Sequence, residues 1–90
     1  MSTINSTVKP SDGWFAIYTG PTANPISIEK NSGTSQAYLA IATAEPDLMF
    51  GHSINAGELK NVVLEDSEKL YVKCVDSLSP GATNIFSVTD

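Results

Sequence analysis

Short β-rich runs recur along this 90-residue chain, and turn-forming residues interrupt them at intervals of about eight to twelve residues. Branched and aromatic residues, which favour strands, fill the runs, whereas Gly, Pro, Asn and Ser fill the breaks. No strand alternates with a long helical pattern, which excludes a doubly wound α/β fold. We therefore expect an all-β protein, a single small antiparallel β-sandwich or barrel of about seven short strands.

The clearest local signal lies between Leu59 and Asp76. Two β-rich runs, Leu59–Leu64 and Leu70–Val75, flank the polar segment Glu65–Glu68, which predicts an antiparallel hairpin. Alternate side chains of a strand point to opposite faces of its sheet. The second run is therefore predicted to bury one set of side chains, namely Leu70, Val72 and Cys74.

The remaining runs predict further strands. Ile26 and Ile28 are expected to point inward, and the break at residues 31–35 has the composition of a hairpin loop. Residues 36–44 are ambiguous because their Ala and Leu content also suits a helix, but the turns on both sides favour a strand. The predicted strands besides the hairpin cover residues 14–19, 26–30, 36–44, 48–54 and 83–89.

Residues 1–12 are rich in Ser, Thr and Asn and end in a turn signal, so we interpret them as a flexible N-terminal arm. The β-sandwich domain then covers residues 13–90. Either the arm is a mobile terminus, or it becomes ordered on a neighbouring subunit with Ile4 and Val8 as its anchors.

The charge balance bears on the class of partner. Ten acidic residues stand against five basic ones, all of them Lys, and the net charge is −5. Nucleic acid binding depends on clustered Lys and Arg, so we expect no nucleic acid partner. The hydrophobic fraction of 41 % predicts a real core, yet a domain this small buries a limited share of its surface. Oligomerisation would add burial.

The chemistry-bearing residues are few. His52 and Cys74 are the only histidine and cysteine, whereas a structural zinc site needs about four ligands. Cys74 lies among valines, which predicts a buried and inert thiol. No phosphate-binding glycine pattern, nucleophile elbow or calcium-loop order is present. We expect no enzyme activity, no metal and no cofactor. No apolar run approaches the ~18 residues of a membrane span, so no membrane contact is expected.

Aromatic residues are too numerous for all of them to point into the core of alternating strands. Some should therefore line a subunit or partner contact, where aromatic side chains are enriched. An exposed aromatic row would equally suit stacking on sugar rings. Together with the two arm anchors, the candidate contact residues are Ile4, Val8, Trp14, Tyr18, Tyr38 and Tyr71.

Several phrases of the sequence resemble small virion proteins of tailed bacteriophages. These are the opening at residues 13–21, the Asn24–Ile28 strand, the Glu68–Lys73 strand and the terminal segment Ile85–Asp90. The resemblance covers residues 13–90. It implies a capsid decoration (cement) protein, a homotrimer that binds the major capsid protein on the capsid surface after synthesis in the host cytoplasm. The alternative is a tail or head-fibre module, or a lectin-like module, that recognises a glycan of the host surface.

Overall fold

The computed structural model describes residues 3–22, 24–33, 35–47, 51–76 and 78–90. Strands dominate it, with one short 3-10 helix, η1, after the first strand. The elements in chain order are β1 (Thr3–Val8), η1 (Pro10–Asp12), β2 (Phe15–Thr19), β3 (Ile26–Ser32), β4 (Gln36–Ala42), β5 (His52–Ile54), β6 (Leu59–Val62), β7 (Lys69–Val75) and β8 (Asn84–Thr89).

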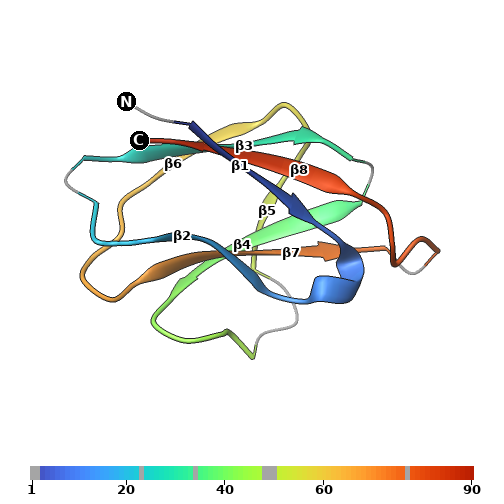
Figure 1. Cartoon of the computed structure of the whole chain (residues 1–90), viewed down its shortest axis with the longest axis horizontal. Coiled ribbons are helices and arrows are strands. Elements are labelled where there is room, and N and C mark those ends of the chain that lie inside the picture. Colours follow the sequence, from blue (N-terminus) through green and yellow to red (C-terminus); the bar gives the residue numbers. More distant parts are fainter. Residues whose placement is uncertain (1–2, 23, 34, 48–50, 77) are drawn as a thin grey trace.

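The strands form two antiparallel four-stranded sheets that pack face to face (Figure 1). Sheet A has the order β1-β8-β3-β6, and sheet B has the order β2-β7-β4-β5. The predicted all-β sandwich is therefore confirmed. The structure places one strand more than the seven expected, because residues 3–8 form β1.

The pairing of the strands is nested. β1 pairs with β8, β2 with β7, β3 with β6 and β4 with β5. The two halves of the chain thus run side by side as one long ribbon that turns back between β4 and β5. The ribbon is rolled up so that β3 also meets β8 and β4 also meets β7. Eight strands connected in this way have the jelly-roll topology.

The core lies between the two sheets and follows the predicted alternation. Ile26 and Ile28 of β3 point inward, as expected, and are at most 1 % exposed. On β7 the predicted face is also the buried one, with Leu70, Val72 and Cys74 in the core. Phe86 and Val88 of β8 fill the centre from sheet A. Burial of these side chains is the main favourable contribution to folding.

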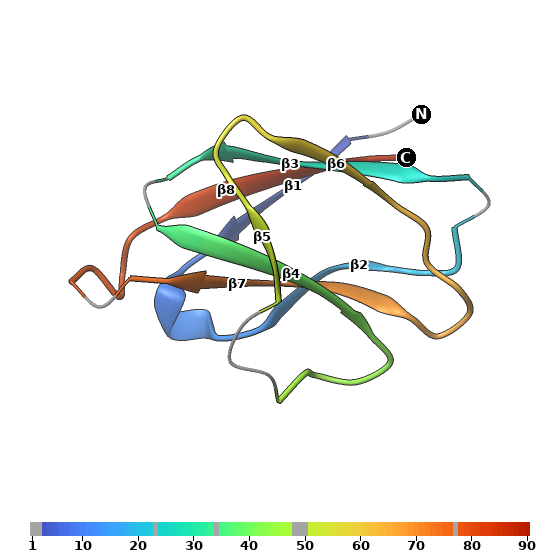
Figure 2. The ribbon, with the colours of Figure 1, turned by 180° about the vertical axis from the view of Figure 1, so that it is seen from behind.

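The predicted hairpin between residues 59 and 75 is wrong, although both of its strands exist. β6 lies at an edge of sheet A against β3, whereas β7 lies inside sheet B between β2 and β4. β7 buries residues on both of its faces, which suits a strand in the interior of a sheet. β6 leaves Leu59 and Asn61 exposed, which suits an edge strand. The turn at Glu65–Glu68 therefore crosses from one sheet to the other (Figure 2).

The second predicted hairpin, across residues 31–35, is wrong for a similar reason. β3 belongs to sheet A and β4 to sheet B, so this connection also joins the two sheets. The strand predicted for residues 36–44 is confirmed as β4. Of the weak strand predicted at residues 48–54, the structure has β5, and residues 48–50 lie outside the described part.

Half of the expected N-terminal arm, residues 3–8 of 1–12, is an edge strand. Residues 3–8 pair with β8 along all six positions, and Val8 is 0 % exposed. Thr3, Asn5 and Thr7 alternate with Ile4, Ser6 and Val8, as expected of an edge strand, and Val8 reaches the core. β1 is therefore an integral strand of the sandwich in the structure.

Deletion of residues 1–8 tests this assignment. We expect the truncated protein to lose at least about 2 kcal/mol of unfolding free energy, since a buried valine alone contributes about 1.5–3 kcal/mol. Urea denaturation followed by tryptophan fluorescence gives the value. An unchanged denaturation midpoint would instead restore the interpretation of this segment as a dispensable arm.

Candidate binding surfaces

The outer face of sheet B carries most of the aromatic residues that the sequence singled out. Trp14 packs there with Ala40 and Tyr71, and Tyr38 lies against them partly buried. Trp14 and Tyr71 are only 7 % and 6 % exposed. Lys73 places its ammonium 5.9 Å from the centre of the Trp14 ring, a cation–π contact that covers it further. These rings form a small second core, in which Tyr38 is only partly buried and so keeps some surface for a partner.

The other three predicted contact residues lie apart from this cluster. Ile4 is 45 % exposed on β1, whereas Val8 belongs to the main core. Tyr18 packs against the main core, and its hydroxyl donates to Asp90 Oδ2 at 3.2 Å. Loss of hydration and this hydrogen bond to Asp90 raise the pKa of Tyr18. The structure therefore does not bring the six predicted residues together into one surface.

Small polar side chains make up most of two rows on the outer face of sheet A. The register aligns Thr3, Thr89, Ser27 and Asn61 in one row across the four strands. The next row consists of Asn5, Ser87, Glu29 and Leu59. We call the outward side chains of these two rows, with Thr7 and Asn31, the hydroxyl–amide face. Glu29 is its single charged member.

Hydrogen bonds between neighbouring strands hold this face in place. The Ser87 hydroxyl donates to Asn5 Oδ1 at 2.6 Å and accepts from the side-chain amide of Asn31. The Ser27 hydroxyl donates to Asn61 Oδ1 at 2.9 Å. Side chains fixed by cross-strand bonds have less rotamer freedom to lose when a partner binds. The face is thus a largely polar, nearly uncharged and ordered surface, with exposed Leu59 as its apolar member.

Sequence reasoning missed this face, although part of its signal was visible. Small polar residues alternate at Thr3, Asn5 and Thr7, and again at Ser87 and Thr89. What the sequence alone did not give was that segments so far apart in the chain lie side by side. That follows from the β1–β8 and β3–β8 pairings.

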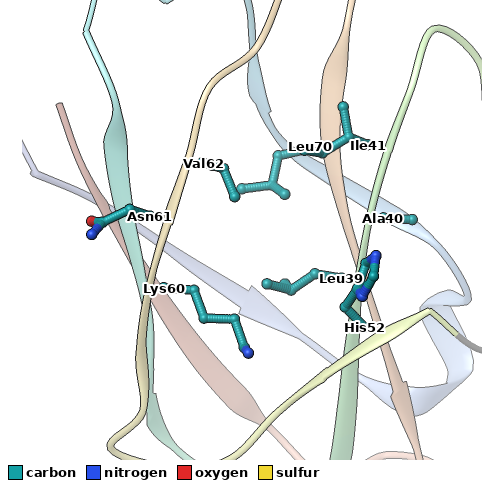
Figure 3. A pocket seen from close by; sticks show the side chains of 8 residues that line it. All are labelled: Leu39, Ala40, Ile41, His52, Lys60, Asn61, Val62 and Leu70. Atoms are coloured by element: carbon teal, nitrogen blue, oxygen red, sulfur yellow. The ribbon is translucent and has the colours of Figure 1, made fainter.

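A pocket of about 380 Å³ opens where the two sheets separate, between β6 and β4 (Figure 3). β5 covers only Ala37–Leu39 of β4, so the rest of that strand has an open edge and Ile41 is 42 % exposed. Val62 and Leu70 point toward one another across the opening, and His52 and Lys60 flank it (Figure 3). The volume suffices for a small apolar group. The residues that line it are Leu39, Ala40, Ile41, His52, Lys60, Asn61, Val62 and Leu70.

Cys74 is buried, as the sequence predicted, at 1 % exposure in the main core. Burial raises the pKa of its thiol to about 11, against a smaller lowering effect of Lys30 and with a small further increase from Asp12. The thiol therefore stays protonated at neutral pH, whereas a cysteine nucleophile requires the thiolate. His52, in contrast, is exposed on β5.

The raised pKa of Cys74 predicts a pH dependence of stability. An unfolded cysteine titrates near pH ~8.5, so the contribution of the neutral buried thiol is complete below that pH. It is then lost as the pH rises toward 11. We expect the urea midpoint of the wild type to fall between pH 8.5 and 11 relative to that of a Cys74→Ala variant. Equal pH profiles for the two proteins would contradict the assignment. Comparing them cancels the titration of lysines and tyrosines.

No cluster of three or more metal-ligating side chains occurs among the residues that the structure describes. The acidic turn at residues 65–68 is closed internally, because the Glu65 amide donates to Glu68 Oε1 at 2.6 Å. Within the same described ranges, no helix is both long and apolar enough to cross a bilayer.

No family model matches the chain, and neither a curated protein nor a solved structure matches it. Its function is therefore argued from the fold and from its surfaces.

Proposed function

We propose that the protein is a bacteriophage capsid decoration (cement) protein, which binds the outside of the major capsid shell as a homotrimer and stabilises it. The jelly-roll topology supports a structural role, since viral capsid proteins and lectins are among its common users. A fold alone does not specify a function, so the surface has to carry the argument.

The hydroxyl–amide face is the observation that carries this proposal. A chain with a net charge of −5 presents there two full rows of side chains with Glu29 as the one charge. The centres of protein interfaces are depleted of charged residues, because each unpaired charge costs free energy when it loses water. Ordered hydroxyl and amide groups can instead exchange water for hydrogen bonds with a shell protein.

A glycan-binding module is the second candidate. The same hydroxyl and amide groups suit hydrogen bonding to sugars, and lectins also use jelly rolls. Sugar stacking, however, calls for exposed aromatic rings, and Trp14 and Tyr71 are buried. Tyr38 is the one aromatic residue of that cluster left for stacking, and it lies on the opposite sheet. The geometry therefore favours a protein partner.

Co-sedimentation with purified capsids that lack the protein tests the proposal. We expect saturable binding, a higher temperature of capsid disruption after binding, and a free protein of three chain masses by light scattering. Absence of binding to capsids, together with binding of a monomer on a glycan array, would replace the proposal with the glycan-binding alternative.

A further inference from the structure

Lys30 lies on the face of β3 that points into the core, because side chains alternate between the two faces of a strand. It follows Ile26 and Ile28 on the inward side of the strand and pairs in register with Phe86, which is fully buried. Lys30 itself is only 3 % exposed. A lysine is almost never buried to this extent unless its charge is paired.

The charge of Lys30 has no paired carboxylate. Its ammonium donates to the Gly33 carbonyl at 2.8 Å, which uses one of its three protons. All ten carboxylate side chains lie in the described part of the chain, and none of them forms an ion pair with Lys30. Within that part of the chain, the ammonium is therefore held by a neutral carbonyl group alone, which is costly for a buried cation.

A pocket of about 340 Å³ adjoins Lys30 at one end of the sandwich. The connections β3–β4 and β5–β6 form this end together (Figure 2), and the Gly57 amide fixes them by donating to the Lys30 carbonyl at 2.9 Å. Lys30 lines the pocket together with Gly33, whose carbonyl accepts from its ammonium, and with amide side chains and a small apolar wall. The residues that line the pocket besides Lys30 are Gly33, Ser35, Gln36, Ile54, Asn55 and Ala56.

We propose that this pocket binds a carboxylate group, with Lys30 as its counter-ion. The amides of Gln36 and Asn55 offer neutral donors for the second oxygen, and Ile54 and Ala56 suit a small apolar substituent beside the carboxylate. Asp76 contacts the pocket residue Ser35 and is an acidic competitor from within the chain. Its two oxygens accept from Ser35 and from the amides of Leu78 and Ser79, which engage it within its own loop. This binding site does not depend on the proposed capsid role.

The charge of Lys30 gives the proposal a readout that a structural role would not produce. Replacing an uncompensated buried charge with an apolar residue of similar shape is often neutral or stabilising. Lys30→Met keeps most of the buried stem and removes the ammonium. We expect this variant to retain or raise the urea midpoint while it loses carboxylate binding by at least tenfold.

Titration with sodium acetate, followed by amide chemical shifts in two-dimensional NMR, measures the binding. We expect saturable shifts at Gly33, Ser35 and Asn55 in the wild type. The control is Lys73→Met, which should show the same shifts, because Lys73 lies over Trp14 on the outer face of sheet B. A wild type without saturable shifts, or a Lys30→Met variant of unchanged affinity, would overturn the proposal. If Lys30→Met does not fold, the uncharged Lys30→Gln variant takes its place, and its affinity for acetate is compared with that of the wild type in the same way.

Two further probes distinguish the source of the carboxylate. The first probe, N-acetyl-alanyl-alanine, ends in a free carboxylate like the C-terminus of a polypeptide. The second probe is the same dipeptide with an amidated C-terminus, which carries no charge. Tighter binding of the free acid than of acetate assigns the pocket to a polypeptide terminus, whereas equal binding assigns it to small carboxylates. Binding of the amide as tight as that of the acid would contradict the role of Lys30 as a counter-ion.

Discussion

Replacement of Phe86 by alanine is expected to lower the unfolding free energy by about 3–5 kcal/mol, the usual cost of removing a buried aromatic side chain. Phe86 is 0 % exposed and is the largest of the fully buried side chains in the described part of the chain. A domain of this length has about 5–13 kcal/mol of total stability, so the loss takes a large part of it. Phe86 also lies on β8, which pairs with both β1 and β3, so the cavity would open at the centre of sheet A.

The neighbouring residue provides a matched control. Ile85 lies on the same strand but points outward, and it is 37 % exposed. We expect Ile85→Ala to cost at most about 2 kcal/mol, because more than a third of the side chain is already in water and no enclosed cavity is left. Phe86→Leu should fall between the two and keeps the comparison possible if Phe86→Ala does not fold. Equal urea midpoints for the Ile85 and Phe86 variants would contradict the assigned faces of β8.

Replacement of Asn84 by alanine is expected to cost about 2–4 kcal/mol, since each buried polar group left without a partner costs about 1–3 kcal/mol. Asn84 is 0 % exposed and connects three parts of the fold. Its Oδ1 accepts from the Ser35 amide at 3.3 Å, and its Nδ2 donates to the carbonyls of Val8 at 3.3 Å and Ala82 at 3.4 Å. Asn61→Ala is the matched control, because Asn61 is exposed and its loss should cost under about 0.5 kcal/mol.

Gly33 allows the contribution of Asn84 to be checked by a double-mutant cycle. Gly33 has a φ of 109°, and a Cβ built there would overlap the Asn84 side-chain amide and lie 2.8 Å from the Asn84 Cα, a contact that an alanine at position 84 would keep. Gly33→Ala should therefore be severely destabilising in the wild type and less so when Asn84 is already alanine, in which that side-chain clash is gone. Strain from the positive φ would remain in both backgrounds. Strictly additive free energies would show that the two residues do not meet.

Alternation along single strands was predictable from the sequence, whereas the partners of the strands were not. The side-chain period of two is a local property of a strand, so the sequence alone predicted the buried faces that contain Ile26, Ile28 and Leu70. The choice between a hairpin at residues 59–75 and a crossing between sheets depends on which neighbours cover β7, and those neighbours, β2 and β4, lie far away in the chain. Strands adjacent in sequence usually pair, as β4 and β5 do, but β6 and β7 do not.

The candidate surfaces were less predictable than the core. Aromatic content drew attention to Trp14 and Tyr71, yet both rings cover each other on sheet B and are buried. Residues with small polar side chains, such as Thr3 and Ser87, carry no distinct signal until the register places them in one face. No inward position was predicted for Lys30 from the sequence, and its burial on the face of Ile26 and Ile28 shows only in the folded chain.

The central claim, that the hydroxyl–amide face docks on a capsid, is tested most directly by one pair of substitutions. Ser87→Lys places a charge at the centre of that face, and Ser53→Lys places the same charge on the outer side of sheet B. Capsid co-sedimentation of both variants, after circular dichroism has confirmed their fold, is the measurement. The account predicts that Ser87→Lys stays in the supernatant while Ser53→Lys sediments with the capsids as the wild type does. Equal sedimentation of the two variants would contradict it.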